Sequence, residues 1–177
     1  MPAAPASFVF GRSPFSLLDI ETTGFSARMH EITEISAIRV DERFQIVAQV
    51  NHLVKICSRV PWEITRLTGL TDSMLSRHGI PLHEALASAH RLISGHRVYA
   101  HNARFDQSFL NAAVEQTAAG CSFTLDCSIP VFKKLLPGRP KYGLSHVAEA
   151  LGVSADGAHR GLKDCTILLS CLQRAHA

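Results

Sequence analysis

The sequence predicts an α/β fold built on a mixed sheet. Its first part reads as consecutive strands joined by short connections, which is typical of antiparallel neighbours. The remainder alternates short strands with segments of helical period, which is typical of crossover units. The 177 residues suit a single domain, which we expect over 12–177 after a loose tail of Pro and Ala over 1–11.

Three strands are expected first. The apolar run from Phe15 to Ile20 is one strand, and the β-branched residues over 31–40 and 44–54 indicate two more. The stretch TTGF breaks the pattern after the first strand, where Gly24 can take the positive φ of a turn. These segments predict the antiparallel part of the sheet.

The chain then changes to a helical period, with two further strands between the helices. Apolar spacing and the positions of Pro and Gly mark the boundaries of each segment. Helices are expected over 61–70, 71–80, 81–95, 103–120, 129–138, 143–153 and 159–177, and strands over 97–102 and 122–128.

Composition narrows the class of protein. A hydrophobic fraction of 46% and a mean hydropathy of +0.11 fit a soluble globular domain, and a net charge of +3 permits a polyanionic partner without requiring one. The five cysteines are odd in number and form no C-x-x-C pair, so neither a disulfide framework nor a zinc site is expected. No apolar run approaches the ~20 residues that cross a membrane, and the N-terminal residues do not resemble a signal peptide. We therefore expect a cytoplasmic protein.

Two carboxylates, Asp19 and Glu21, end the first apolar run. Residues two apart on a strand point to the same face, so both side chains should lie together. Two anions this close repel unless one holds a proton or a cation lies between them. The spacing alone equally allows a polar strand end with both groups in water.

A third carboxylate, Asp106, follows the fourth expected strand and falls in the first turn of a helix. The helix dipole by itself favours a carboxylate there. A strand–helix junction is, however, also where α/β proteins build their sites. Asn102 precedes this helix, where its simplest role is an N-cap.

A fourth carboxylate, Asp164, lies five residues after His159. Five helical residues turn through about 500°, which would point the two side chains apart. They can share a site only if His159 lies on the loop before the closing helix. Taken alone, His159 could equally be a surface histidine.

The combined set of three Asp, one Glu and one His indicates a particular chemistry. Hard oxygen ligands suit Mg²⁺ or Mn²⁺ rather than zinc. Two such ions ~3.5–4 Å apart can clamp the attacking and leaving oxygens of a phosphodiester. Histidine titrates near neutral pH and can deprotonate the attacking water.

Three motifs carry a resemblance to a known family. The stretches DIETTG (19–24), HNARFD (101–106) and HRGLKD (159–164) resemble the exonuclease motifs of the DEDDh, or DnaQ-like, 3′–5′ exonucleases. That family includes the proofreading epsilon subunit of bacterial DNA polymerase III and RNase T. The resemblance extends from about residue 12 to the end of the chain, and a histidine rather than a tyrosine precedes the last Asp.

The resemblance implies an RNase H-like fold with a five-stranded mixed sheet flanked by helices. It implies that Asp19, Glu21, Asp106 and Asp164 bind two divalent ions, Mg²⁺ or Mn²⁺, and that His159 is the general base. The implied activity is hydrolysis at the 3′ ends of single-stranded nucleic acid, with DNA as the expected substrate and release of nucleoside 5′-monophosphates.

The resemblance also implies residues that touch the substrate. The backbone of Thr22, Thr23 and Gly24, and the side chain of Asn102, should lie against the terminal nucleotide. Leu70 is the candidate to wedge at the terminal base, although a core leucine is an equal alternative for this position.

Several alternatives stay open. The chain could be a non-catalytic nucleic-acid-binding module that retains the fold, or its carboxylates could merely solvate loops. A DNA polymerase is a possible partner, but no obvious docking tail follows the closing helix. The sequence does not distinguish DNA from RNA, nor a monomer from a homodimer.

Overall fold

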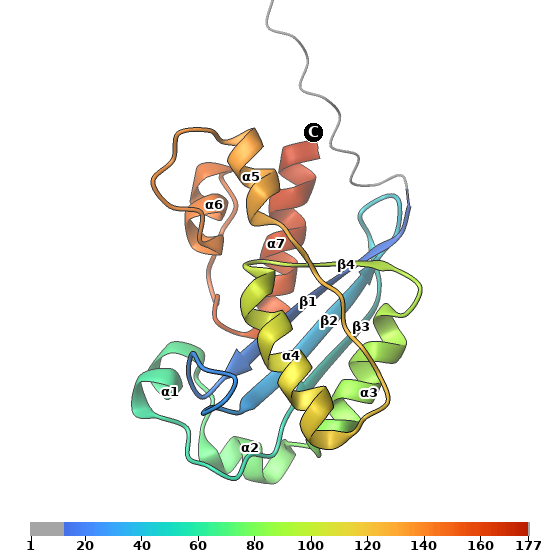
Figure 1. The fold of residues 1–177 in the computed structure, drawn as a ribbon. Helices are drawn as coiled ribbons and strands as arrows, with labels where there is room; N and C mark the ends of the chain where they lie inside the picture. The colour runs from blue at the N-terminus through green and yellow to red at the C-terminus, as the bar shows by residue number, and fades with distance from the viewer. Residues whose placement is uncertain (1–12, 177) are drawn as a thin grey trace, which may run out of the picture.

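The computed structural model describes residues 13–176. The expected tail over 1–11 lies outside the described residues. A five-stranded mixed sheet forms the centre, with helices packed against it (Figure 1). The expected α/β class is therefore confirmed.

The sheet has the strand order β3-β2-β1-β4-β5, so β1 lies in its middle. Neighbours β1, β2 and β3 are antiparallel, whereas β4 pairs with β1 and with β5 in parallel. The strands are β1 (Phe15–Thr22), β2 (Ile32–Val40), β3 (Ile46–Leu53), β4 (Arg97–Ala100) and β5 (Asp126–Cys127). The antiparallel start and the later crossovers match the sequence prediction.

Helices cover both faces of this sheet. One apolar core lies between the sheet and the third and fourth helices, and a second lies between the sheet and the last three helices. The first two helices are short and lie near the end of the sheet where β1 terminates (Figure 1). The helices are α1 (Trp62–Thr68), α2 (Asp72–His78), α3 (Leu82–Ile93), α4 (Ala103–Thr117), α5 (Ile129–Leu135), α6 (Leu144–Ala150) and α7 (Gly161–His176).

Alternation along β1 divides its side chains between the two cores. Leu18 and Ile20 pack toward α3 and α4, while Phe15 and Leu17 pack toward α7. Asp19 and Glu21 continue the series begun by Phe15 and Leu17, so they lie on the α7 side. The face that receives the carboxylates is therefore fixed by the apolar residues before them.

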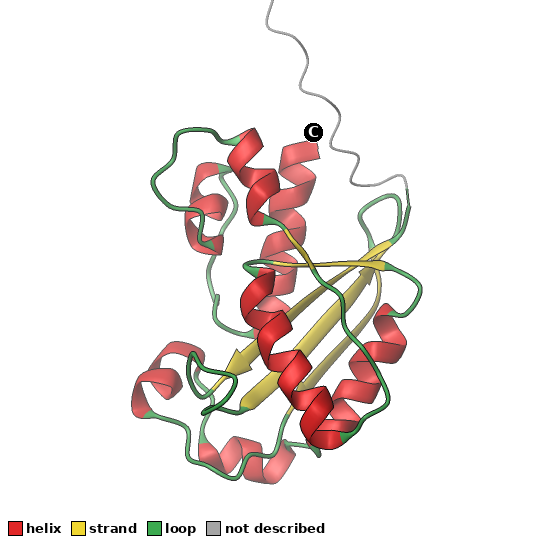
Figure 2. Ribbon diagram, in the orientation of Figure 1, coloured by secondary structure: helices red, strands yellow, loops and turns green. Residues whose placement is uncertain are grey.

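The fifth strand is much shorter than expected. Only Asp126–Cys127 pairs with β4, although the sequence predicted a strand over 122–128. The loop before β5 is held by a side chain and not by β4. The Gln107 amide of α4 donates to Phe123 O at 2.8 Å and accepts from Leu125 N at 3.0 Å. A side chain thus replaces a neighbouring strand, and Figure 2 shows this stretch as a loop.

Gly24 does not take the positive φ that the sequence analysis expected for it. A Cβ atom at this position would lie 2.4 Å from the ring of His30. A larger residue at this position would therefore displace the His30 ring, and no positive φ favours glycine here.

The helices of the described region are also too short or too polar to pass through a lipid bilayer.

Candidate active site

The end of β1 and the start of α7 bring three carboxylates together. Carboxylate oxygens of Asp19, Glu21 and Asp164 all lie within 4.8 Å of one another. The first two come from one face of β1, as their spacing predicted, and the third comes from the first turn of α7. The sequence therefore identified all three members of this cluster.

Gly161 allows α7 to approach the sheet this closely. A Cβ atom on Gly161 would lie 2.5 Å from Ser36 Oγ on β2 and 3.4 Å from the carbonyl oxygen of Asp19 on β1. Ser36 cannot easily move, because it is buried and its hydroxyl donates to Asn51 Oδ1 at 2.6 Å. The sequence analysis did not single out Gly161, since only the docked helix reveals the contact.

Asp106 joins from the opposite side of the sheet. The β1–β4 pairing ends at Leu17 and Tyr99, so β1 extends beyond its parallel neighbour. There the backbone N–H of Ile20 donates to Asp106 Oδ1 at 3.3 Å, in place of a strand partner. Asp106 is only 2% exposed and lies close enough to Asp19 to raise its pKa, although it is outside the group of three.

His159 lies on the loop before α7, as the angular argument required. Its φ is +67°, and its backbone N–H lies 3.2 Å from both carboxylate oxygens of Asp164. Its side chain is exposed, so the imidazole can meet a substrate at the edge of the carboxylate cluster.

Burial raises the pKa of each of these carboxyl groups, and repulsion from neighbouring carboxylates adds to the effect at Asp19 and Glu21. Burial, reinforced by Asp106 and Glu21, raises the pKa of Asp19 well above its usual range. Burial and the charge of Asp164 raise the pKa of Glu21 to about 8. Burial raises the pKa of Asp106 to about 7, and it also raises that of Asp164. Arg160 acts in the opposite direction on the pKa of Glu21, and His159 does so on that of Asp164, but burial outweighs both.

A fifth carboxylate, Glu34, was missed by the sequence analysis. It pairs in register with Glu21 across β1 and β2, and its side chain is fully buried. Arg160 donates to both of its oxygens, at 2.9 and 3.2 Å, and Gly161 N donates at 3.0 Å. Glu34 looks like an ordinary polar residue of an alternating strand, so only the pairing register reveals it.

The expected substrate-binding residues occupy different environments. Thr22 Oγ1 donates to Gly24 O at 2.6 Å, and Thr23 Oγ1 accepts from Glu31 N at 3.0 Å, so both hydroxyls are engaged inside the protein. Asn102 has φ +63° before α4, and its exposed side chain makes no capping bond. Leu70 is 0% exposed, which is the position of a core leucine. Contact between these residues and a nucleotide stays a prediction.

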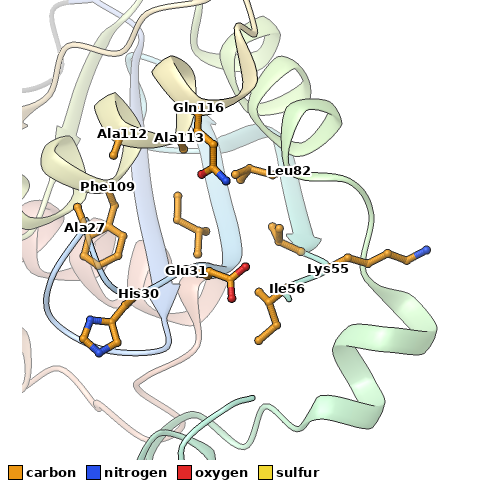
Figure 3. Close-up of a pocket in the computed structure, with 12 residues that line it drawn as sticks. Ala27, His30, Glu31, Lys55, Ile56, Leu82, Phe109, Ala112, Ala113 and Gln116 are labelled. Atoms are coloured by element: carbon orange, nitrogen blue, oxygen red, sulfur yellow. The ribbon is translucent and has the colours of Figure 1, made fainter. Parts of the chain in front are cut away.

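A separate small pocket lies between α4 and the segments around Glu31 and Lys55 (Figure 3). Its volume is about 50 Å³, and none of the clustered carboxylates lines it. Small-molecule sites usually occupy roughly 300–1,000 Å³, so this pocket holds at most a few water molecules. The carboxylate cluster is the candidate site.

The sequence profile of the RNase_T family, described as exonuclease, matches residues 16–172. This match spans the three motifs and every element from β1 to most of α7. The chain belongs to the RNase T/DnaQ-like family of 3′–5′ exonucleases.

Relatives in this family differ widely in length. The chain is 32% identical over 156 residues to the DNA polymerase III subunit epsilon of Aquifex aeolicus, covering 86% of this chain and 75% of that protein. It is 30% identical over 151 residues to the PolC-type DNA polymerase III of Clostridium perfringens, covering 85% of this chain and 10% of that protein. The match to PolC is therefore to one part of a much larger enzyme.

Solved exonucleases share the fold. E. coli exonuclease I in complex with a dA16 oligonucleotide superposes with a TM-score of 0.78 at 18% identity, covering 93% of this chain and 40% of that one. Exonuclease X in complex with 5′ overhanging duplex DNA gives 0.72 at 21% identity, covering 91% and 90%. These likenesses confirm the RNase H-like fold that the motifs implied.

The cluster has the donor chemistry of a site for divalent cations. Its ligand atoms are carboxylate oxygens, which hard ions such as Mg²⁺ prefer. Its raised pKa values reflect burial first and repulsion between neighbouring carboxylates second. Arg160 forms its ion pair with Glu34, and its charge also lowers the pKa of Glu21 without outweighing burial. Bound cations would relieve the remaining repulsion.

We expect the metal-free protein to lose stability as the pH rises. The folded-state pKa values of about 7 for Asp106 and about 8 for Glu21 lie above the ordinary values of 3.8 and 4.5. In that window the folded state binds more protons than the unfolded chain, so the free energy of unfolding falls with increasing pH. Thermal unfolding in EDTA from pH 5 to 9 should show a falling Tm. Mn²⁺ should restore the Tm most strongly at high pH, because it replaces the lost protons.

Two variants test the source of this effect. Glu21→Gln should flatten the pH dependence, whereas Asp126→Asn, in an exposed ion pair, should leave it unchanged. A Tm that is constant or rises between pH 5 and 9 in EDTA would contradict the assignment.

Gly161→Ala should disturb the site by moving α7. The added methyl group meets Ser36 and the backbone of Asp19, so overpacking should cost about 1–3 kcal/mol of stability. Displacing Asp164 should also lower any metal-dependent activity roughly tenfold or more. Gly143→Ala is the control, because there a Cβ meets only a side-chain atom of His146, at 3.3 Å. Equal behaviour of the two variants, measured by thermal unfolding and Mn²⁺ calorimetry, would refute the close-approach argument.

Proposed function

We propose that the chain is a metal-dependent 3′–5′ exonuclease that hydrolyses phosphodiester bonds at the 3′ ends of single-stranded nucleic acid, with DNA as the expected substrate. The convergence of Asp19, Glu21 and Asp164 within 4.8 Å, with Asp106 and His159 beside them, carries this proposal. The expected domain over 12–177 and two ions, Mg²⁺ or Mn²⁺, per site are part of it.

The four carboxylates would hold the ions, and each has a distinct position. Asp19 and Glu21 lie on β1 and Asp164 lies in the first turn of α7, while the charges of Asp106 and Glu21 both raise the pKa of Asp19. Divalent ions bound there would activate water and neutralise negative charge on the phosphodiester.

His159 is assigned as the general base. Its imidazole accepts a proton from the water whose oxygen attacks phosphorus, and the bond from phosphorus to the 3′ oxygen of the preceding nucleotide breaks. The departing 3′ oxygen takes a proton from solvent water and becomes the new 3′-hydroxyl end, and a nucleoside 5′-monophosphate leaves. An exposed imidazole on a loop can meet the water at the edge of the cluster.

Exposed apolar side chains support a single-stranded substrate. Phe25 and Met29, in the loop that follows β1, are 87% and 81% exposed, and Trp62 and Leu67 of α1 are 65% and 50% exposed. The loop is tied toward α1 because Glu31 accepts bonds from the backbone of Cys57 and Ser58. Unstacked bases pack well on such side chains. The solved complex of E. coli exonuclease I contains a dA16 oligonucleotide.

The proposal also includes a location in the cell and a partner protein. A cytoplasmic location rests on the five cysteines, which all carry free thiols. A DNA polymerase partner rests on the similarity to the epsilon subunit of Aquifex aeolicus. The choice between proofreading and independent repair or RNA processing depends on that partner, as does the choice between a monomer and a homodimer.

The second candidate is a non-catalytic nucleic-acid-binding module with the same fold. The intact carboxylate set argues against it, since binding alone does not need four acidic groups beside a polyanion. Mn²⁺ calorimetry distinguishes the two, because a module without metal chemistry has no reason to bind the ion.

Asp19→Asn should abolish degradation of a 5′-labelled single-stranded DNA, as should EDTA. Asp19 is central to the cluster, so this substitution should lower the activity by more than the ~10–100-fold that is typical when an outer partner of a metal ligand is removed. Matched RNA and DNA oligonucleotides, followed on denaturing gels, give substrate preference in the same assay. Asp126→Asn is the control and should retain full activity. A wild-type protein that leaves both oligonucleotides intact in Mg²⁺ and in Mn²⁺ would refute the proposal.

Trp62 offers a binding measurement that needs no turnover. It is the only tryptophan of the chain, it is exposed, and the Arg66 guanidinium lies 5.2 Å from its ring centroid. Binding of a single-stranded oligonucleotide to the Asp19→Asn variant should quench its fluorescence. Trp62→Ala should raise the KM of the active enzyme about tenfold, since base stacking contributes ~1–3 kcal/mol.

Val47→Ala is the matched control for Trp62→Ala, because Val47 is similarly exposed, at 56%, on the edge strand β3. Unchanged fluorescence together with an unchanged KM would remove Trp62 from the binding surface.

A further inference from the structure

The ion pair between Glu34 and Arg160 joins β2 to the loop that carries His159. Both oxygens of Glu34 accept from Arg160, at 2.9 and 3.2 Å, and one also accepts from the backbone N–H of Gly161. Glu34 is 0% exposed, whereas the Arg160 side chain is 37% exposed. A buried carboxylate is costly unless it is paired and hydrogen-bonded, and here three N–H groups meet that need.

The pair anchors a short segment in an unfavourable conformation. His159 directly precedes Arg160 and has φ +67°, which non-glycine residues rarely adopt unless their surroundings impose it. On the other side, Gly161 is held by Glu34 and by its close approach to Ser36. Two consecutive residues after His159 are therefore fixed to β2.

The same pair keeps Glu34 out of the carboxylate cluster. Glu34 is the register neighbour of Glu21, so its charge lies next to the proposed metal ligands. Arg160 donates to both of its oxygens and Gly161 donates to one of them, so both oxygens of Glu34 are already hydrogen-bonded in this arrangement. The guanidinium of Arg160 is paired with the buried Glu34 carboxylate, so it is not a free cation facing the substrate.

We propose that Arg160 is a positioning residue: its pair with Glu34 holds the 159–161 segment so that the His159 imidazole is retained beside Asp164. The assignment rests on the proposed exonuclease activity with His159 as general base. Stability alone does not explain such a pair, since apolar residues of similar volume often stabilise a buried site equally well.

A double-mutant cycle tests this assignment. Arg160→Ala should lower kcat about 10- to 100-fold with KM changed less than about twofold, because a displaced base slows the reaction without weakening substrate binding. His159→Ala should lower kcat on the order of 10²–10⁴-fold. The double variant should be no slower than His159→Ala, because Arg160 acts only through His159.

Two further variants distinguish a loss of positioning from a loss of folding. Arg160→Ala leaves Glu34 buried without its partner, so Arg160→Lys is measured as well, and it should give a smaller loss of kcat in the same direction because Lys cannot donate two parallel bonds. Arg97→Ala breaks the exposed ion pair with Asp126, far from the argued segment in sequence, and should leave kcat unchanged. Thermal unfolding identifies the variants that are folded. If Arg160→Ala is unfolded, the kcat of Arg160→Lys alone tests the positioning role.

The possible results separate the positioning role from other roles. A KM that rises while kcat stays constant would make Arg160 a substrate contact, and a double variant as slow as the product of the two single losses would make its role independent of His159. Wild-type kcat in a folded Arg160→Lys and Arg160→Ala would overturn the proposal outright. An inactive wild-type protein would instead refute the exonuclease function, and an active one that tolerates His159→Ala would refute the base assignment.

Discussion

The repulsion among buried carboxylates at the end of β1 is the constraint on which the rest of the site depends. Asp19, Glu21 and Asp164 present oxygens within 4.8 Å of one another, and burial raises the pKa of each above its usual range. No local interaction in a short peptide would hold these groups together. The packing of the whole domain must therefore supply the free energy that their proximity costs.

That packing reaches each carboxylate by a different route. Pairing with β2 fixes Asp19 and Glu21, because Asp19 lies opposite Ser36 and Glu21 lies opposite Glu34 in the antiparallel register. Asp164 arrives with α7, whose first residue, Gly161, lacks the atom that would hold the helix away. Asp106 bonds a backbone N–H that is available only because the pairing with β4 stops earlier along β1. The site is thus a product of topology as much as of the acidic residues.

The sequence predicted the parts of this arrangement that follow from local pattern. Strand alternation put Asp19 and Glu21 on one face, and this prediction was confirmed. The helix expected over 159–177 instead begins at Gly161, so His159 lies on the loop, which is the position that a shared site with Asp164 requires. The sequence also predicted the antiparallel start of the sheet, because short connections leave few other topologies.

Features that depend on tertiary register were not predictable in this way. Glu34 becomes significant only when β2 pairs with β1 so that it lies beside Glu21, and nothing local distinguishes it from Glu31 or Glu42. The shortness of β5 depends on a side-chain amide from α4, and the reason for Gly24 depends on the ring of His30. In each case a contact distant in sequence, or a side-chain orientation, decided the outcome.

Glu21 and Glu34 are neighbouring carboxylates, and among the described residues only one of them has a positively charged partner in an ion pair. They are register neighbours on the same face of the sheet, yet Glu34 receives a bidentate arginine and a backbone N–H, while Glu21 has a pKa of about 8. If the domain needed only stability, a second arginine beside Glu21 would serve it. An internal cation therefore meets one carboxylate, and the adjoining cluster keeps its oxygens free of such a partner. Divalent ions from solution would supply positive charge to this cluster, with which no arginine in the described part of the chain forms an ion pair. Their binding would then offset the free energy that is lost by burying its carboxylates close together.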